Sequence, residues 1–154
     1  MKPLENIKRL GLFRRLTTGG RYVRREGNMI RILLAEDDDV MRQYLVRALE
    51  RSGYAVTGVD RGTKALALVQ AGEEFDLLLT DIVMPELDGI ELAQKVTVLK
   101  PDMRVMFITG FSAVTLKAGQ SLPNAKVLSK PFHLRDLVME VDRTFETDVA
   151  SGLS

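Results

Sequence analysis

Residues 77–92 read LLLTDIVMPELDGIEL, and this stretch contains the transition that decides the fold. It opens inside Phe75–Thr80, a short leucine-rich run of the kind found in parallel strands buried on both faces. It closes inside Gly89–Leu99, where apolar residues recur at helical spacing. A strand followed by a helix is the repeating unit of α/β folds. We therefore predict an α/β domain in which Asp81 follows the end of a buried strand.

The same alternation of strand and helix extends in both directions from this stretch. Runs rich in leucine and β-branched residues predict five strands: Ile30–Ala35, Ala55–Val59, Phe75–Thr80, Arg104–Thr109 and Lys126–Ser129. Amphipathic stretches predict five helices: Val40–Ser52, Thr63–Ala71, Gly89–Leu99, Ser112–Gln120 and His133–Phe145. This order predicts a doubly wound, five-stranded parallel sheet covered by helices on both faces.

Residues 1–28 differ from the rest of the chain in charge and in pattern. They hold eight Lys/Arg and two Asp/Glu, whereas residues 29–154 hold fourteen and nineteen. Because the first segment has no sustained apolar period, we interpret it as a disordered leader or an extension upstream of the native start. A basic arm that binds nucleic acid or anionic lipid is the alternative, although we expect neither partner. We place the folded domain at 29–147 and a short tail at 148–154.

The composition excludes several kinds of site. Hydrophobic residues make up 45% and charged residues 28% of the chain, as in ordinary soluble domains. The absence of cysteine excludes disulfides and thiolate metal sites, and a single histidine, His133, cannot form a histidine cluster. No apolar run approaches the roughly 18 residues of a membrane span. We expect a cytoplasmic protein in which His133 is a surface residue at the start of a helix.

Polar residues stand at the ends of four predicted strands. Glu36–Asp39 follow the first strand, Asp81 follows the third, Thr109 ends the fourth and Lys130 follows the fifth. Each alone has an ordinary interpretation, since acids after a strand often cap the next helix, as we expect for Asp38 and Asp39. In an open α/β sheet, however, the carboxyl ends of the strands meet at one edge, where ligands bind. We therefore predict a site at this edge.

The carboxylates at this edge favour a particular chemistry. Two unit charges about 4 Å apart repel by roughly 4 kcal/mol at an effective dielectric of about 20, so clustered acids need a cation or take raised pKa values. Hard oxygen ligands suit Mg²⁺ better than zinc or copper. A magnesium ion with a lysine and a hydroxyl nearby is suited to phosphoryl transfer, with an aspartate as the nucleophile.

Four segments resemble the signature segments of the CheY-like receiver family of response regulators: ILLAEDDDVMR (32–42), LLLTDIVMPELDGIEL (77–92), VMFITGFS (105–112) and VLSKPF (127–132). The resemblance spans about Met29 to Phe145. It implies a flavodoxin-like or CheY-like sheet with strand order 2-1-3-4-5. It also implies a signalling protein that accepts a phosphoryl group from a histidine kinase or a histidine phosphotransferase.

The resemblance assigns roles to the first carboxylates. It implies that Asp81 is the phosphoacceptor and that Mg²⁺ is held by Glu36, Asp37, Asp81 and the backbone carbonyl of Val83. Glu36 stands where aspartate is common in the family, and its longer side chain should still serve a water-mediated contact with the metal.

The resemblance also assigns roles at the last two strands. It implies that Thr109 and Lys130 contact the phosphoryl group and that the Lys130–Pro131 peptide bond is cis. The aromatic residue that the family usually places three positions before the lysine is replaced here by Val127. The usual coupling between threonine movement and burial of an aromatic ring is therefore in doubt.

The expected output is contact with another protein, because few residues follow Phe145. Beyond the family, the sequence is similar to the alphaproteobacterial CpdR group, whose single-domain members control the ClpXP protease. This similarity implies ClpXP as a downstream partner.

The alternative function is a Mg²⁺-dependent phosphohydrolase, but Val83 stands where a second acid would protonate the leaving group. A nucleotide-binding fold is disfavoured because the first strand runs into carboxylates instead of a glycine-rich turn. We therefore expect no enzyme.

Overall fold

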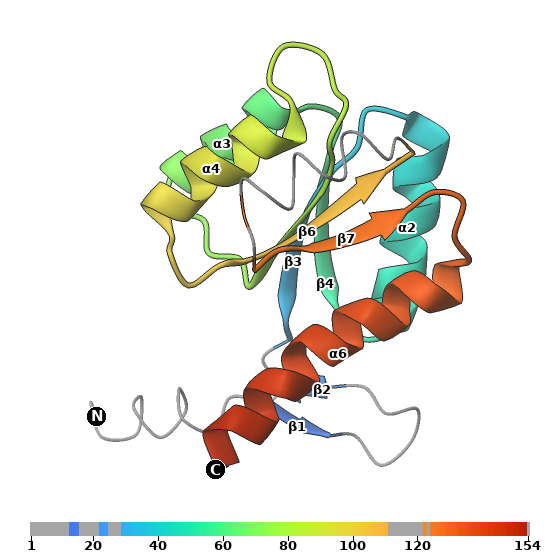
Figure 1. Ribbon diagram of the computed structural model, residues 1–154, viewed down its shortest axis with the longest axis vertical. Helices are drawn as coiled ribbons and strands as arrows, with labels where there is room; N and C mark the ends of the chain where they lie inside the picture. The colour runs from blue at the N-terminus through green and yellow to red at the C-terminus, as the bar shows by residue number, and fades with distance from the viewer. Residues whose placement is uncertain (1–12, 16–21, 25–28, 111–121, 123, 154) are drawn as a thin grey trace.

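The computed structural model describes residues 13–15, 22–24, 29–110, 122 and 124–153. Its main feature is a five-stranded parallel sheet (Figure 1). The strands are β3 (Arg31–Ala35), β4 (Ala55–Val59), β5 (Leu77–Asp81), β6 (Arg104–Thr109) and β7 (Lys126–Ser129). Their order is β4-β3-β5-β6-β7, which is 2-1-3-4-5 when the strands of this sheet are numbered along the chain. The predicted fold class and strand order are confirmed.

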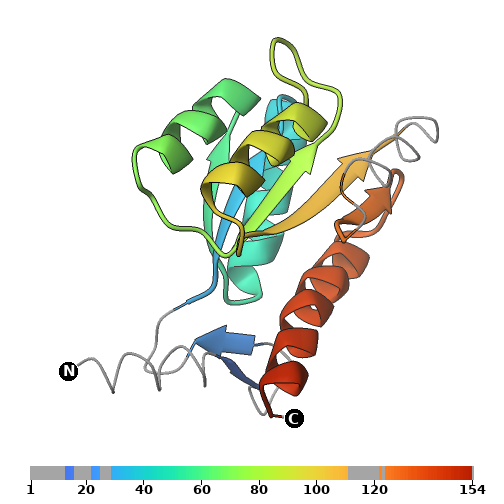
Figure 2. The same cartoon turned by 60° about the vertical axis from the view of Figure 1, so that its left-hand side comes forward.

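Helices cover both faces of the sheet. The helices are α2 (Asp39–Arg51), α3 (Gly62–Gln70), α4 (Gly89–Leu99) and α6 (Leu134–Leu153). Helices α3 and α4 contact each other on one face, and α2 contacts α6 on the other (Figures 1 and 2). The predicted helix Ser112–Gln120 lies outside the described residues. Among the described helices, none is long and apolar enough to cross a bilayer.

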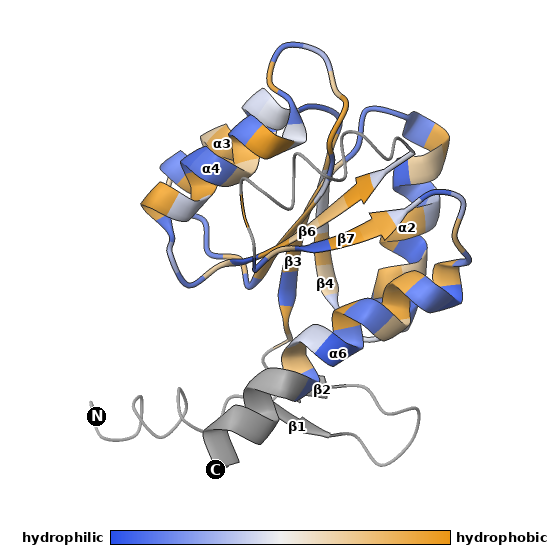
Figure 3. Ribbon diagram, viewed as in Figure 1, coloured by the Kyte–Doolittle hydropathy of each residue, from blue (hydrophilic) through white to orange (hydrophobic). Residues whose placement is uncertain are grey.

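The core consists of two apolar clusters, one on each face of the sheet. Neighbouring residues of a strand point to opposite faces, so Leu78 packs toward α3 and α4 while Leu77 and Leu79 pack toward α2 and α6. All three side chains are fully buried. Hydrophobic residues accordingly lie along the strands in Figure 3. Burial on both faces explains why β5 has a continuous leucine run.

Capping residues fix where the helices begin. The Asp38 carboxylate accepts a hydrogen bond from the Met41 amide at 2.9 Å, and Asp88 accepts one from the Glu91 amide at 2.8 Å. The capping role predicted for Asp38 is therefore confirmed. Each cap stands just after a loop that leaves the carboxyl end of a strand, so the two helices start close to the predicted site.

Helix α6 is longer than predicted. It continues to Leu153, whereas the sequence predicted an end at Phe145 and a tail over 148–154. No proline interrupts this part of the chain. Phe145 is buried beside Tyr54, and the Tyr54 hydroxyl donates a hydrogen bond to Asp142. These contacts anchor the middle of α6 to the domain.

The leader contains secondary structure that the sequence analysis did not predict. Strand β1 (Phe13–Arg15) pairs antiparallel with β2 (Tyr22–Arg24), and both strands contact α6 (Figure 2). Strands of three residues are too short to give a recognisable alternation of apolar and polar residues. The interpretation of residues 1–28 as a disordered leader or an extension upstream of the native start does not include these two strands, and it stays a prediction.

Candidate functional site

Three carboxylates gather at the carboxyl edge of the sheet. Asp81 ends β5, and Glu36 and Asp37 follow the neighbouring strand β3. One oxygen from each residue lies within 4.8 Å of the others. Glu36 is 1% exposed and Asp81 is 8% exposed, whereas Asp37 is open to solvent. The convergence predicted from the strand ends is confirmed for these three residues.

Lys130 brings a positive charge to the same cluster. Its ammonium donates a hydrogen bond to Asp81 Oδ2 at 3.3 Å and lies 3.7 Å from Glu36 Oε2. The peptide bond between Lys130 and Pro131 is cis, as the sequence predicted. The lysine therefore forms ion pairs with both buried carboxylates.

Thr109 lies at the same edge. It ends β6, is 1% exposed and accepts a hydrogen bond through its carbonyl from the Lys130 amide at 2.7 Å. In the sheet register, Asp81 pairs with Ile108, the residue before Thr109. The predicted threonine therefore stands one position beyond the register partner of the predicted phosphoacceptor.

Glu36 is held by the protein through all but one of its polar atoms. Its amide donates to the Val59 carbonyl at 3.1 Å, its carbonyl accepts from Arg42 Nη1 at 2.9 Å, and its Oε1 accepts from the Asp38 amide at 3.1 Å. Its Oε2 is buried and has no hydrogen-bond partner among the described residues. A buried carboxylate oxygen without a donor is suited to contact with a cation.

The electrostatics of the cluster agree with this geometry. Burial raises the pKa of Glu36 to about 7, and the nearby charge of Asp81 adds to the rise, although the hydrogen bond from Asp38 opposes it. Burial would lower the pKa of Lys130, but attraction to Asp81 and Glu36 outweighs burial and raises it. The edge thus concentrates negative charge that one lysine only partly neutralises, as in the acidic clusters typical of receiver Mg²⁺ sites.

Close packing supports the backbone of Asp81. The Thr80 hydroxyl donates a hydrogen bond to the Asp81 carbonyl at 2.8 Å. Gly89, the first residue of α4, packs so closely that a Cβ atom there would lie 2.1 Å from the same carbonyl oxygen. The Gly89 amide donates to the Ile82 carbonyl at 2.8 Å. Val83, in the loop between, is 52% exposed, and a contact of its carbonyl with a metal stays a prediction.

Two residues that support the site are not among those predicted from the sequence. Thr80 lies in a predicted strand with no predicted polar role, and Arg42 has no predicted role. Arg42 stands three residues after Asp39 in a predicted helix, a spacing that favours an ion pair on one helix face, so part of its role could have been found. Its hydrogen bond to the Glu36 carbonyl could not, because a backbone acceptor leaves no mark in the sequence.

Comparisons with known proteins agree with this arrangement. The profile of the family described as "Response regulator receiver domain" matches residues 32–142. The response regulator receiver protein CpdR of Brucella abortus (strain 2308) is 60% identical over 116 residues, which are 75% of this chain and 96% of that protein. The sensor kinase CckA of the same organism is 36% identical over 119 residues, 75% of this chain and 12% of the kinase. The structure of Vibrio cholerae chemotaxis protein CheY4 is similar, with a TM-score of 0.68 and 26% identity, and the match covers 75% of this chain and 98% of that one.

Proposed function

The chain belongs to the response regulator receiver family, and from this membership we propose that it accepts a phosphoryl group on Asp81 from a histidine kinase or a histidine phosphotransferase. The observation that carries the proposal is the position of Asp81, which ends the central strand β5 beside two further carboxylates and Lys130. Likeness to the receiver protein CpdR over nearly its whole length supports a signalling regulator and not a catalytic enzyme.

The chemistry follows from the nature of an aspartate nucleophile. A carboxylate oxygen of Asp81 attacks the phosphorus atom and forms an acyl phosphate, while the bond from phosphorus to the donor's imidazole nitrogen breaks. Lys130, which pairs with Asp81, stays close enough to balance the charge of the phosphoryl oxygens. We assign the Thr109 hydroxyl as a hydrogen-bond donor to the same oxygens.

The donor set fits Mg²⁺. Three carboxylates supply hard oxygen ligands, and Oε2 of Glu36 is a buried oxygen that accepts no hydrogen bond among the described residues, although the Lys130 ammonium lies 3.7 Å away. We propose that Glu36, Asp37, Asp81 and the Val83 carbonyl hold the ion. When bound, Mg²⁺ would offset the negative charge of the carboxylates and of the incoming phosphoryl group.

The partners are proposed from similarity. The chain matches the receiver protein CpdR over 96% of that protein's length. From the resemblance of the sequence to the CpdR group we propose output through protein contacts, with the ClpXP protease as the candidate partner in the cytoplasm. Likeness to part of the sensor kinase CckA supports a donor of the phosphorelay type. A pull-down that compares wild type with Asp81→Ala, with and without phosphorylation, tests whether the protease binds one state selectively.

Intact-mass analysis after incubation with acetyl phosphate and Mg²⁺ tests the phosphoacceptor. We expect one phosphoryl group on the wild-type chain and none on Asp81→Asn. Asp60→Asn is the matched control, because Asp60 follows the neighbouring strand β4 and lies outside the carboxylate cluster, so it should be labelled like wild type. Full labelling of Asp81→Asn would refute the assignment, and equal labelling in EDTA would remove the metal from the proposal.

A further inference from the structure

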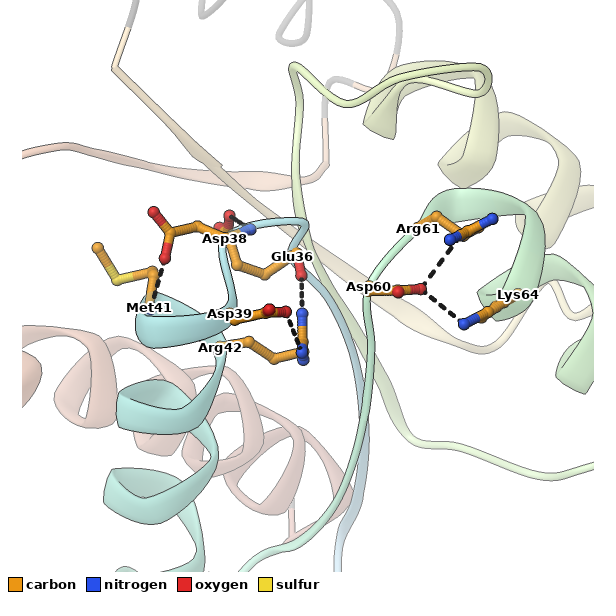
Figure 4. A network of polar contacts seen from close by, with 8 residues as sticks. All are labelled: Glu36, Asp38, Asp39, Met41, Arg42, Asp60, Arg61 and Lys64. Carbon is orange, nitrogen blue, oxygen red and sulfur yellow. Dashed lines mark hydrogen bonds and ion pairs between the residues drawn. The ribbon is translucent and has the colours of Figure 1, made fainter.

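Arg42 connects helix α2 to the loop that carries two of the three carboxylates. Its Nη1 donates to the Glu36 carbonyl at 2.9 Å, and its Nη2 donates to Asp39 Oδ1 at 2.6 Å (Figure 4). The side chain is only 19% exposed although it carries a full charge. One guanidinium therefore binds both ends of the segment from Glu36 to Asp39, and Asp37 lies within that segment.

The orientation of Glu36 depends on three contacts, and Arg42 supplies one of them. The others are the Val59 carbonyl, which accepts from the Glu36 amide, and the Asp38 amide, which donates to Oε1. With these contacts in place, Oε2 is the atom turned toward Lys130. We propose that Arg42 is a positioning residue that holds this loop so that Glu36 and Asp37 face Asp81 before a metal binds. This inference rests on the proposed function.

The aliphatic part of the Arg42 side chain lies beside Gly58 of the neighbouring strand β4. A Cβ atom on Gly58 of β4 would lie 3.4 Å and 3.5 Å from Cγ and Cδ of Arg42, and 3.1 Å from Cγ2 of Val46. The aliphatic part of the arginine thus passes over a strand position that has no side chain. Because packing fixes this part, less side-chain freedom is lost when the guanidinium forms its two hydrogen bonds.

Positioning and charge predict opposite effects, which makes the proposal testable. Arg42 is a cation near a site for a cation, so its charge alone weakens Mg²⁺ binding. If charge dominated, Arg42→Gln would bind Mg²⁺ more tightly and Arg42→Lys would match wild type. If positioning dominates, both variants bind more weakly, since neither side chain can serve two acceptors with the planar fork of a guanidinium.

The experiment is a titration of each full-length variant with MgCl₂ alone, followed by NMR chemical shifts. We expect both Arg42→Gln and Arg42→Lys to bind Mg²⁺ about tenfold more weakly, the lower end of the effect that outer contacts have on metal sites. Arg61→Gln is the matched control, because Arg61 also pairs with an aspartate, Asp60, in a neighbouring loop (Figure 4). Its affinity should equal that of wild type.

A second measurement uses the metal-free protein. The Asp38 amide, which donates to Glu36 Oε1, should exchange with solvent faster in both Arg42 variants than in wild type, while amides in β5 keep their protection. Tighter Mg²⁺ binding by Arg42→Gln, or affinity and exchange equal to wild type in both variants, would overturn the inference.

Failure of the inference can be told apart from failure of the proposed function. If wild type binds Mg²⁺ and is phosphorylated on Asp81 but the Arg42 variants behave in the same way, only the role of Arg42 is refuted. If wild type itself neither binds Mg²⁺ nor is labelled, the proposed function is refuted and the role of Arg42 with it. Arg42→Lys keeps the charge and the aliphatic part of the side chain, so it provides the test even if Arg42→Gln folds poorly.

Discussion

Two loops at the same edge of the sheet use the same residue types in different surroundings (Figure 4). After β3, Asp39 pairs with Arg42 in the first turn of α2, and after β4, Asp60 pairs with Lys64 of α3 at 2.9 Å and with Arg61 at 3.2 Å. The Asp39–Arg42 contact is the shortest of the three, at 2.6 Å. Only the first loop contains a buried carboxylate, that of Glu36, and Arg42 also donates to the backbone carbonyl of this residue.

The two loops differ in the burial of Glu36 and not in the burial of their paired aspartates, since the Asp39 side chain is 76% exposed and that of Asp60 is 34% exposed. The ion pairs of Asp60 are weak, because its partners Arg61 and Lys64 are exposed, so water and salt screen the charges and the side chains lose freedom. A buried carboxylate is costly to keep ionised, so the groups around Glu36 affect both the stability of the fold and the affinity for a cation. Changes in the two loops should therefore have unequal effects.

Substitutions in the two loops should differ most in their effect on Mg²⁺ affinity. We expect Glu36→Ala combined with Asp37→Ala to weaken Mg²⁺ binding at least about tenfold, or roughly 1.4 kcal/mol, because two ligands are lost. Asp60→Ala combined with Lys64→Ala should leave the affinity unchanged, as measured by the same titration. Removal of like charges should also leave the metal-free fold as stable as wild type or more stable. If the double variant of Asp60 and Lys64 lost as much Mg²⁺ affinity as the double variant of Glu36 and Asp37, the predicted difference between the two loops would be wrong.

Substitutions in the two loops should show the second largest difference in their effect on the pH dependence of stability. A carboxyl group whose pKa rises on folding, here from 4.5 to about 7 for Glu36, holds its proton more tightly in the folded state. The metal-free protein should therefore lose stability as pH rises from about 4.5 to about 7, by about 3 kcal/mol at most. Urea denaturation at pH 5 and pH 8 measures this loss, and Glu36→Gln should remove most of it. If Asp60→Asn reduced the loss of stability between pH 5 and pH 8 as much as Glu36→Gln does, the raised pKa of Glu36 would not be its cause.

The smallest effect should come from the exposed pair itself. Hydrogen bonds from Lys64 and Arg61 hold the pKa of Asp60 below its ordinary value, so any stabilisation is present above that ordinary value and is lost as pH falls through the lowered one. We expect Asp60→Asn to change the urea midpoint at pH 7 only slightly, and the change should vanish in about 1 M salt, where the Debye length is about 3 Å. A large change that persisted in salt would show that this loop has a structural role.

The sheet and the position of the site could be predicted because both depend on residue type and period. Buried strands have apolar runs of characteristic length, and parallel topology brings their carboxyl ends together, so the sequence alone predicts Glu36, Asp37, Asp81 and Lys130 at one edge. The boundary of β5 was misplaced by one residue at its end, since Asp81 itself belongs to the strand. A polar residue that ends a strand gives no apolar signal.

The remaining features depend on interactions that sequence patterns do not record. The role of Arg42 depends on a backbone carbonyl, and that of Gly58 on the absence of a side chain where the arginine passes. The strands Phe13–Arg15 and Tyr22–Arg24 are too short to show a period, and the end of α6 at Leu153 has no proline to mark it. The Arg42 contact uses a backbone atom that all residue types share, and the Gly58 contact depends on a side chain that glycine lacks.

The close packing of Gly89 on the Asp81 carbonyl has a consequence for the variation that this chain can tolerate. Position 89 has no free volume, because even one added methyl group would overlap an atom of the strand that carries Asp81. A saturation library screened only for folded protein should therefore already reject every replacement at residue 89. Selection would then keep glycine at position 89 because a side chain does not fit there, whatever its charge, its reactivity or its effect on partner binding.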